Sequence, residues 1–340
     1  MNWSNLFVLT VSAAIGPEAV RYILGAQGLN IHYGYTGLFN FGQAGFMAVG
    51  AYGVAIVSAS EQAGGLGYSV WLGVLAGLVA AVLLALLMGV PTLRLRGDYL
   101  AIVTIAASEI IRLVIRSERF DWLTGGNSGI NGFANSFFDA NPFDNSHRYE
   151  FGPFEYLGKD LWVMLIGWLV IAFFGLLTFL LMRSPWGRVL RSIRENEDAV
   201  RSLGKNVQAY KMQALVLGGV MGAVGGAIYA LYQNLALPDD FVTRTTFIAY
   251  AALILGGAAR VGGPIIGGVI WYGIFAFMTN LVTEVSGTSW FKSASWLPSI
   301  VKDNAGQFPF VFLGVALMLL VVFRPQGIFG DRREVELDAR

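Results

Sequence analysis

Two pairs of opposite charges stand inside stretches of the sequence that are otherwise apolar. Glu18 and Arg21 are three residues apart in the first such stretch, and Glu109 and Arg112 repeat the spacing in a later one. Residues three apart share one face of a helix, so each carboxylate can pair with its guanidinium, which lowers the high cost of charge in lipid. The pairs could serve as gate or coupling elements. We favour the interpretation that they are structural pairs, in which each charge neutralises the other at a subunit interface. For Glu109 and Arg112, a position near the outer membrane boundary is a further explanation.

Glycines interrupt two apolar stretches, one in each half of the chain. Residues 33–45 and residues 255–268 are both rich in glycine, and the second stretch also contains a proline. Non-helical backbone persists at membrane depth only where protein or water satisfies its polar groups, and a pair of such segments points to a transport site or a gate. Close packing of backbones at tight turns is the favoured explanation for most of the glycines themselves. The residues predicted to line or shape a translocation pathway are Tyr33, Asn40, Phe41 and Gln43.

The basic connection at residues 183–206 contains a short helix with clear end signals. Asn196 can cap its first turn, while Glu197 and Asp198 favour the positive end of the helix dipole. Gly204 supplies the left-handed residue that commonly ends a helix. The sequence therefore predicts one complete helix about 10 Å long, at 1.5 Å per residue.

Three apolar residues of this helix, Ala199, Val200 and Leu203, lie on one face at spacings of three and four. A helix this short is marginal alone, so something must pack on that face. A groove on a partner protein would serve, and so would the ends of the chain's own membrane helices. A basic connector without a docking role is the alternative interpretation of residues 183–206.

Several kinds of catalytic or binding site are absent from the sequence. There is no cysteine, and the only histidines, His32 and His147, lie in different connections. We therefore expect no disulfide, no metal site and no histidine-based triad. A phosphate-binding loop is also missing, because Gly158 and Lys159 are followed by Asp160 instead of Ser or Thr. The prediction is that this chain carries no cofactor and is not an enzyme.

The composition places the chain in a membrane. Of its 340 residues, 55% are hydrophobic and 13% are charged, whereas soluble domains average about 25% charged residues. Trp71–Val90 and Leu161–Met182 contain no charge, and each has the roughly 20 residues that cross a hydrocarbon core of about 30 Å. We predict an all-α, polytopic integral membrane protein that forms a single transmembrane domain over residues 1–340. About nine segments, including glycine-interrupted ones, are expected at residues 5–32, 42–60, 69–90, 98–117, 160–182, 207–233, 242–258, 264–283 and 307–323.

Lys and Arg are shared unevenly among the connections. One alternating set of connections carries most of them, and the positive-inside rule assigns that set to the cytoplasm. Residues 183–206 and the tail 324–340 then lie in the cytoplasm. The long connections at residues 118–159 and 284–306 lie outside the cell.

Six motifs, in order along the chain, are similar to the branched-chain amino-acid permease family of ABC importers, LivM type. Within one of them, Glu197–Gly204 resembles the Glu-Ala-Ala…Gly loop with which such permeases dock into a cleft of the ATPase subunit. Asp198 departs from that pattern, which has alanine there. The six motifs lie at residues 28–46, 93–104, 124–126, 184–206, 255–267 and 324–329. The resemblance implies that the ATPase-docking residues are Glu197, Asp198, Ala199, Val200, Leu203 and Gly204.

The resemblance further implies one permease subunit of an ATP-driven importer of branched-chain, aliphatic amino acids, a multi-pass protein of the bacterial cell membrane. The expected partners are a second, homologous permease, two cytoplasmic ATPases that bind ATP and Mg²⁺, an extracytoplasmic substrate-binding protein and the lipid bilayer, but no nucleic acid. A permease for urea or short amides is the alternative within the family. Outside it, an ion-coupled secondary transporter or a passive channel for urea or a small amide would also show such features without ATPase partners.

Overall fold

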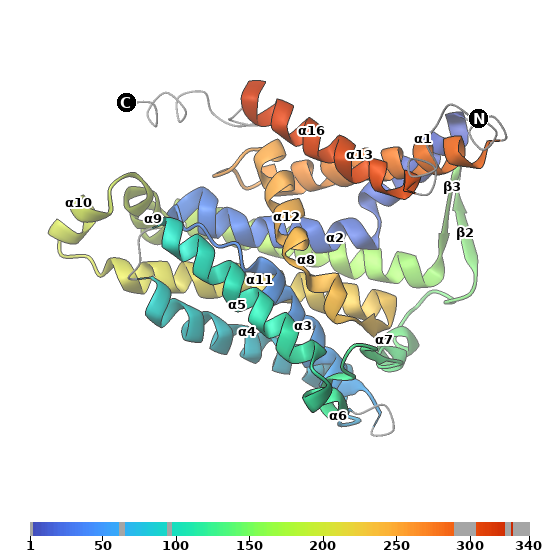
Figure 1. Cartoon of the computed structure of the whole chain (residues 1–340), viewed down its shortest axis with the longest axis horizontal. Coiled ribbons are helices and arrows are strands. Elements are labelled where there is room, and N and C mark those ends of the chain that lie inside the picture. Colours follow the sequence, from blue (N-terminus) through green and yellow to red (C-terminus); the bar gives the residue numbers. More distant parts are fainter. Residues whose placement is uncertain (1–2, 61–64, 94–96, 289–303, 324–327, 329–340) are drawn as a thin grey trace.

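The computed structural model of the protein describes residues 3–60, 65–93, 97–288, 304–323 and 328, and helices dominate it (Figure 1). The helices are α1 (Trp3–Ile15), α2 (Pro17–Leu29), α3 (Gln43–Ser58), α4 (Val70–Thr92), α5 (Gly97–Arg116), α6 (Asp121–Thr124), α7 (Asn135–Asp139), α8 (Gly158–Arg183), α9 (Pro185–Glu195), α10 (Glu197–Ser202), α11 (Val207–Gln233), α12 (Thr243–Gly256), α13 (Gly263–Gly287) and α16 (Phe308–Phe323). Shorter elements are the π-helix η1 (Asn30–Tyr35), the 3₁₀ turns η3 (Glu118–Phe120), η4 (Pro238–Phe241) and η5 (Ala305–Gln307), and the strands β1 (Ile130–Asn131), β2 (Arg148–Phe151), β3 (Phe154–Leu157) and β4 (Leu235–Ala236). The all-α class predicted from the sequence is confirmed.

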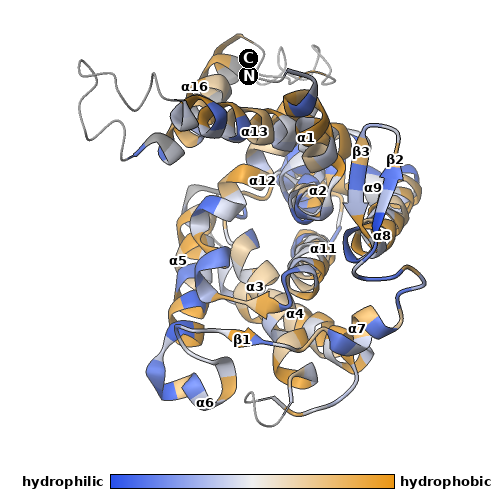
Figure 2. Cartoon of the chain, turned by 90° about the vertical axis from the view of Figure 1, so that its right-hand side faces the viewer, coloured by the Kyte–Doolittle hydropathy of each residue, from blue (hydrophilic) through white to orange (hydrophobic). Residues whose placement is uncertain are grey.

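Helix α11 runs through the middle of the bundle, with α2, α3, α4 and α8 packed around it (Figure 2). Small residues let these helices approach closely. A Cβ atom added to Gly226 of α11 would lie only 2.0 Å from the carbonyl oxygen of Met47 in α3. A Cβ atom on Gly218 would lie 2.4 Å from the carbonyl oxygen of Gly28 in α2. Close approach at small residues is typical of helices packed in membranes.

Helices α4 and α8 expose apolar side chains at the periphery of the bundle. On α4, Trp71 is 66% exposed and Leu87 is 74% exposed, and on α8, Leu169 is 62% exposed and Phe173 is 60% exposed. Apolar surface of this extent is costly in water and suits contact with lipid. The two charge-free stretches of the sequence therefore form peripheral helices of a membrane protein.

The first predicted segment, residues 5–32, is broken into two helices. α1 and α2 meet at Gly16 with a bend of 44°, and Pro17 occupies the first turn of α2. Proline has no N–H to continue the ladder of α1 and its ring clashes with the preceding turn, which accounts for a break at this residue. The helical path then continues beyond Leu29 as the π-helix η1.

The expected count of about nine spans is not confirmed. In the described part of the chain, α4, α8, α11 and α13 are long and apolar enough to cross a membrane, and the bent pair of α1 and α2 makes a fifth if it is one span. Helices α3, α12 and α16 have 16, 14 and 16 residues, which is about 21–24 Å of helix. That length falls short of a core about 30 Å thick. Helix α5 has 20 residues but carries Glu109, Arg112 and Arg116.

The predicted outer connection, residues 118–159, folds into η3, α6, α7, β1 and the hairpin of β2 and β3. Strand β1 pairs with β4, with Ile130 opposite Ala236, so this connection is fastened to the one between α11 and α12. The hairpin and the α9–α10 region lie at opposite ends of the molecule (Figure 1). The assignment of these two ends to the outside and the cytoplasm stays a prediction.

Two other predicted connections fall largely outside the described residues. For the outer connection 284–306, residues 289–303 lie outside the described part of the chain, and for the tail 324–340 only Ile328 lies within it. The backbone N–H of Ile328 donates to the carbonyl oxygen of Leu255 at 2.8 Å.

Candidate coupling and translocation site

Helix α10 is the short capped helix that the sequence predicts. The Oδ1 atom of Asn196 accepts a hydrogen bond from the backbone N–H of Ala199 at 3.0 Å. Gly204 follows the helix with a φ of +75°, and no atom lies within 4 Å of the position that a Cβ would take. Backbone conformation, rather than crowding, is therefore the reason for glycine at this position.

The apolar residues of α10 point in two directions. Val200 is 5% exposed and belongs to the main hydrophobic core, where α10 contacts α9 and α11. Leu203 is 79% exposed, and Ala199 is exposed as well. This corrects the assignment of Val200 to the docking surface, because the side chain anchors α10 to its own membrane domain. The surface left open to a partner contains Asp198, Ala199, Leu203 and Gly204.

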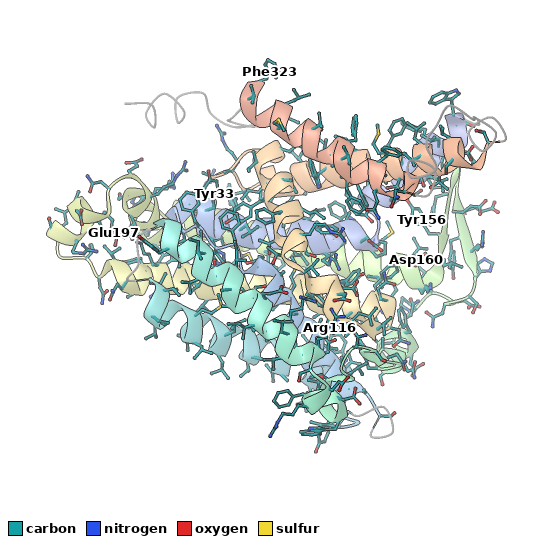
Figure 3. The ribbon with its side chains drawn as sticks, in the orientation of Figure 1. Tyr33, Arg116, Tyr156, Asp160, Glu197 and Phe323 are labelled. Carbon is teal, nitrogen blue, oxygen red and sulfur yellow. The ribbon has the colours of Figure 1, made fainter. Side chains whose placement is uncertain are left out.

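The acidic residues of α10 are paired within the chain. Arg201 donates to Glu197 at 2.8 Å and to Asp198 at 2.9 Å. Lys211 of α11 also pairs with Glu197, and the Lys211 side chain is largely buried. Glu197 marks the end of the molecule at which these contacts hold α10 against α11 (Figure 3). The helix is therefore a preformed element with a defined position.

Helix α9 connects α10 to the interior of the bundle. Its own residues Leu190 and Ile193 are buried against the bundle. The Nη1 atom of Arg194, also in α9, donates to the carbonyl oxygen of Gly34 at 2.7 Å. Gly34 lies in η1, at the start of the first glycine-interrupted segment. A guanidinium bonded to a carbonyl is a charge-assisted contact, and such contacts are stronger than neutral ones. One short helix and one hydrogen bond therefore separate α10 from the interrupted segment.

The two glycine-interrupted segments lie against each other. Asn30 of η1 donates its Nδ2 to the carbonyl oxygen of Arg260 at 2.8 Å and accepts the backbone N–H of Ala259 at 2.8 Å. A Cβ atom on Gly34 would lie 2.7 Å from the nitrogen of Ala259. Because a larger residue does not fit at Gly34, glycine is what allows η1 to approach the turn between α12 and α13.

Asn40 and Gln43, two of the four predicted pathway residues, lie in a buried polar network. Nδ1 of His32 is 3.0 Å from Nδ2 of Asn40, and Nε2 of His32 is 3.1 Å from the carbonyl oxygen of Leu215. The Nε2 atom of Gln43 donates to the carbonyl oxygen of Gly218 at 3.0 Å. A neutral imidazole protonated at Nε2 satisfies both of its contacts. Direct contact of these two amides with a solute stays a prediction, since in this conformation their polar groups are bonded within the protein.

Tyr33 and Phe41 are partly exposed and belong to an aromatic cluster. The ring of Tyr250 in α12 has its centroid 5.9 Å from that of Tyr33 and 4.8 Å from that of Phe41. Phe39 and Phe247 extend the cluster and are 40% and 48% exposed. Of the predicted pathway residues, Tyr33 and Phe41 are therefore the two that a passing solute or a partner chain could touch.

The predicted pairing of Glu18 with Arg21 is wrong. Glu18 instead accepts a hydrogen bond from the hydroxyl of Tyr272 at 2.9 Å. Arg21 is 5% exposed, donates to the hydroxyl of Tyr22 at 2.7 Å and lies 3.8 Å from the ring centroid of Tyr229. Aromatic faces attract cations, so two tyrosines occupy the place expected for the carboxylate.

The predicted pairing of Glu109 with Arg112 is confirmed and extends further than expected. The Nε atom of Arg112 donates to Glu109 at 3.0 Å, and its Nη1 donates to Asp239 of η4 at 2.8 Å. Arg116 bonds the same carboxylate at 3.3 Å. Burial raises the pKa of the next carboxyl, Asp240, whereas Asp239 is more exposed and acts as the ion-pair partner. Through Asp239, Arg112 and Arg116 tie α5 to the connection between α11 and α12.

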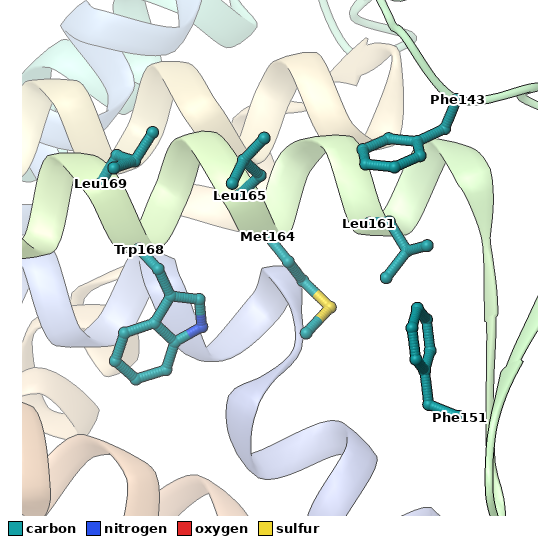
Figure 4. Close-up of a pocket in the computed structure, with 7 residues that line it drawn as sticks. All are labelled: Phe143, Phe151, Leu161, Met164, Leu165, Trp168 and Leu169. Carbon is teal, nitrogen blue, oxygen red and sulfur yellow. The ribbon is translucent and has the colours of Figure 1, made fainter.

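An apolar hollow of about 420 Å³ follows the surface of α8 (Figure 4). Residues of α8, including Leu165 and Leu169, form its floor, and Phe143 and Phe151 of the preceding connection close one end. The Nε1 atom of Trp168, its one polar side-chain group, donates to the carbonyl oxygen of Ile15 at 2.9 Å. Such a hollow suits a lipid chain better than a polar solute. Among the described residues, no group of three or more His, Asp or Glu could hold a metal ion.

Residues 17–323 match the family described as the permease component of the branched-chain amino acid transport system. The chain belongs to this family. It is 29% identical to the high-affinity branched-chain amino acid transport system permease protein LivM of Salmonella typhimurium, over 93% of this chain and 69% of that protein. The nucleoside ABC transporter permease protein NupC of Lactococcus lactis subsp. cremoris is 28% identical over 84% of both chains. Among solved structures, PsaBC from Streptococcus pneumoniae in complex with Fab aligns with 98% of this chain and 94% of that chain, at 14% identity and a TM-score of 0.34.

Membership of the family makes this chain a transport component of the ABC permease type and a multi-pass membrane protein. Sequence reasoning missed three residues that organise the permease: Asn30, His32 and Arg194. Asn30 and His32 were hidden among apolar neighbours. Arg194 stood among several arginines of a basic connection, and only the folded chain shows which of them reaches η1.

Proposed function

We propose that this permease is a transmembrane subunit of an ATP-driven importer of branched-chain, aliphatic amino acids. In this proposal it pairs with a homologous permease, and two cytoplasmic ATPases bind ATP and Mg²⁺. A soluble binding protein delivers the amino acid from outside, and α10 docks one ATPase. The observation that carries the proposal is the hydrogen bond from Arg194 of α9 to Gly34. Through α9, this bond links the capped and exposed helix α10 to the interrupted segment in the membrane domain.

The proposed coupling follows the described contacts in order. Closure of the ATPases on ATP displaces α10 through its exposed surface, which contains Leu203. Helix α9 passes the displacement to Gly34 through Arg194. The bonds of Asn30 carry η1 and the α12–α13 turn together. Tyr33 and the rest of the aromatic cluster then move between outward-facing and inward-facing positions.

The name of the LivM relative supports branched-chain amino acids as the solute. Its identity to this chain is higher than that of the nucleoside permease relative, and it covers more of this chain. Nucleoside import is therefore the second candidate, and urea or a short amide is the third. All three would use the same docking helix, so a transport assay has to separate them.

The first test concerns the docking of the ATPases. A tagged chain is co-expressed with its transport partners, purified in mild detergent, and its bound proteins are identified. Leu203→Arg adds charge to the exposed apolar residue, and Gly204→Val forces a β-branched residue into the left-handed region. Both are expected to remove the ATPases. Gly204→Asn is the matched control, because asparagine tolerates that conformation, and it should keep them.

The second test concerns the energy source and the solute. The purified complex is reconstituted in liposomes with labelled leucine, guanosine or urea, with and without enclosed ATP. The proposal predicts uptake of leucine that requires ATP and the binding protein. If the chain purifies alone and moves solute without ATP, the importer is excluded and a secondary transporter or a channel takes its place.

A further inference from the structure

The last turn of α8 places a positive charge on the surface of the bundle that faces lipid. The guanidinium of Arg183 lies 4.0 Å from the ring centroid of Phe179, one turn earlier on the same helix. Phe179 is 37% exposed, and its neighbours Leu176 and Leu180 are 58% and 57% exposed. Long basic side chains cover apolar surface with their stems and keep their charged heads in a polar layer. Arg183 therefore marks where the apolar surface of α8 ends, away from the β2–β3 hairpin (Figure 1).

Helix α9 brings a second arginine to this boundary. The corner between α8 and α9 is tight, because a Cβ atom on Gly187 would lie 2.5 Å from the Cα of Met182. The next residue, Arg188, is exposed. Trp186, in the first turn of α9, donates its Nε1 to Oε1 of Gln213 at 2.8 Å, and tryptophan is typical of the layer between lipid chains and water. Two exposed arginines therefore flank one corner of the chain at that layer.

The end of α8 does not need these two arginines for its own stability. The hydroxyl of Ser184 donates to the carbonyl oxygen of Leu181 at 2.7 Å, and Arg191 donates to that of Met182. Among the residues that the structure describes, neither the Arg183 nor the Arg188 guanidinium has a carboxylate partner. Both charges are therefore free to bind an anion.

From these contacts we infer that Arg183 and Arg188 bind the phosphate of an anionic glycerophospholipid, whose acyl chains lie on Leu176 and Leu180. Guanidinium groups match phosphate in geometry as well as in charge, and basic residues directly beside a membrane helix attract anionic lipids. A zwitterionic lipid would bring an ammonium group close to both arginines, and α9 has only one acidic residue, Glu195, to receive it. The site selects anionic lipids for this reason, whichever solute the permease carries.

Lipid titration of the full chain tests the inference. The chain is purified in mild detergent, and native mass spectrometry measures its binding of phosphatidylglycerol and of phosphatidylcholine with identical acyl chains. Phosphatidylglycerol should bind more tightly. Arg183→Gln and Arg188→Gln should each weaken its binding about fivefold, and the double variant by roughly 25-fold, whereas phosphatidylcholine binding should not change. Arg183→Lys should weaken it less, because the charge remains. Arg119→Gln, a matched change at an exposed arginine of η3, should have no effect.

Two results of the titration would overturn the site. Equal affinities for the two lipids would do so, as would unchanged phosphatidylglycerol binding in the double variant. Glycerol 3-phosphate carries the phosphate without acyl chains, so it should not compete at the same concentration as the lipid. Competition at that concentration would make the ligand a soluble anion and exclude the lipid.

Co-purification with the transport partners separates the lipid from a protein that covers the same arginines. The double variant of Arg183 and Arg188 should retain the ATPases, since α10 is untouched, whereas Leu203→Arg should remove them. Loss of the ATPases from the double variant, with unchanged phosphatidylglycerol binding, would assign the arginines to a protein partner and overturn the lipid site. Lipid binding that depends on both arginines, in a chain that purifies without ATPases, would keep the lipid site and count against the importer alone.

Discussion

Replacing Arg194 by alanine is expected to uncouple ATP hydrolysis from transport while the ATPases remain bound. Nη1 of Arg194 donates to the carbonyl oxygen of Gly34 at 2.7 Å, and the stem of the side chain passes Gly37, where a Cβ would lie 3.3 Å from Cγ of Arg194. Arg194→Ala removes both contacts. The docking helix α10 is unaffected, since its cap is Asn196 and its anchor is Val200.

The expected size of the effect is taken from the hydrogen bond between Arg194 and Gly34. A hydrogen bond to a charged group contributes about 1.5–3 kcal/mol, and Arg194 is only half-buried, so a value near 1.5–2 kcal/mol is reasonable. A free energy of 1.4 kcal/mol is a tenfold change in an equilibrium constant. The coupling between the docked ATPase and the interrupted segment should therefore weaken by roughly 10- to 30-fold.

The assay is the number of leucine molecules imported per ATP hydrolysed by the complete complex in liposomes, with the loaded binding protein. Arg194→Ala should lower this ratio by about tenfold while ATPase co-purification is unchanged, and Arg194→Lys should recover part of it. Arg191→Ala is the matched control, because Arg191 lies on the same helix and donates to the carbonyl oxygen of Met182 in α8 instead of to η1. If Arg194→Ala keeps the original ratio, or Arg191→Ala lowers it equally, α9 is not the path of coupling.

Three further predictions concern stability. Asn30→Ala removes two bonds between η1 and the α12–α13 turn and should lower the free energy of unfolding by about 2 kcal/mol, seen as a lower midpoint in thermal unfolding; an unchanged midpoint would contradict it. Gly226→Leu should abolish the folded yield measured by size-exclusion chromatography, because its Cβ meets backbone at 2.0 Å, whereas Gly287→Leu, with open space around it, should keep the yield. Asp239→Asn should lower the free energy of unfolding by at most ~1 kcal/mol, because that carboxylate is 59% exposed. Arg112→Ala should lower the free energy of unfolding by more, because the Arg112 side chain is only 13% exposed. Equal effects of the two changes would refute this reasoning from burial.

Local signals predicted α10 well, and tertiary contacts decided what they could not. The cap at Asn196 and the terminal Gly204 act within a few residues, so the sequence contains all the information they need. The direction of Val200 depends instead on the positions of α9 and α11. Helical spacing placed Val200 and Leu203 on one face, but two neighbouring helices cover only the first of them.

The two charged pairs show the same limit. A spacing of three residues permits a carboxylate and a guanidinium to meet, and Glu109 and Arg112 do so. For Glu18 the preferred partner is Tyr272, 254 residues further along the chain. Spacing within one helix carries no information about such a competitor. Pro17 lies inside one predicted segment, residues 5–32, whereas the structure breaks the helix there, with a bend of 44° between α1 and α2.

The non-helical stretch at residues 37–42 and the first turn of α3 keep their shape because neighbouring helices replace the hydrogen bonds that a continuous helix would make. The backbone N–H of Phe41 donates to Oγ1 of Thr104 in α5 at 3.0 Å, and that of Ala44 donates to Oγ1 of Thr246 in α12 at 2.8 Å. The side chain of Gln43, the first residue of α3, donates its Nε2 to the carbonyl oxygen of Gly218 in α11 at 3.0 Å. A segment bonded to three helices cannot move far without either breaking those bonds or carrying the helices with it, and buried bonds are costly to break. A displacement that enters at η1 should therefore move α5, α11 and α12 as a set, and Gln43, one of the two amides predicted to line the pathway, would serve transport through its bond to α11.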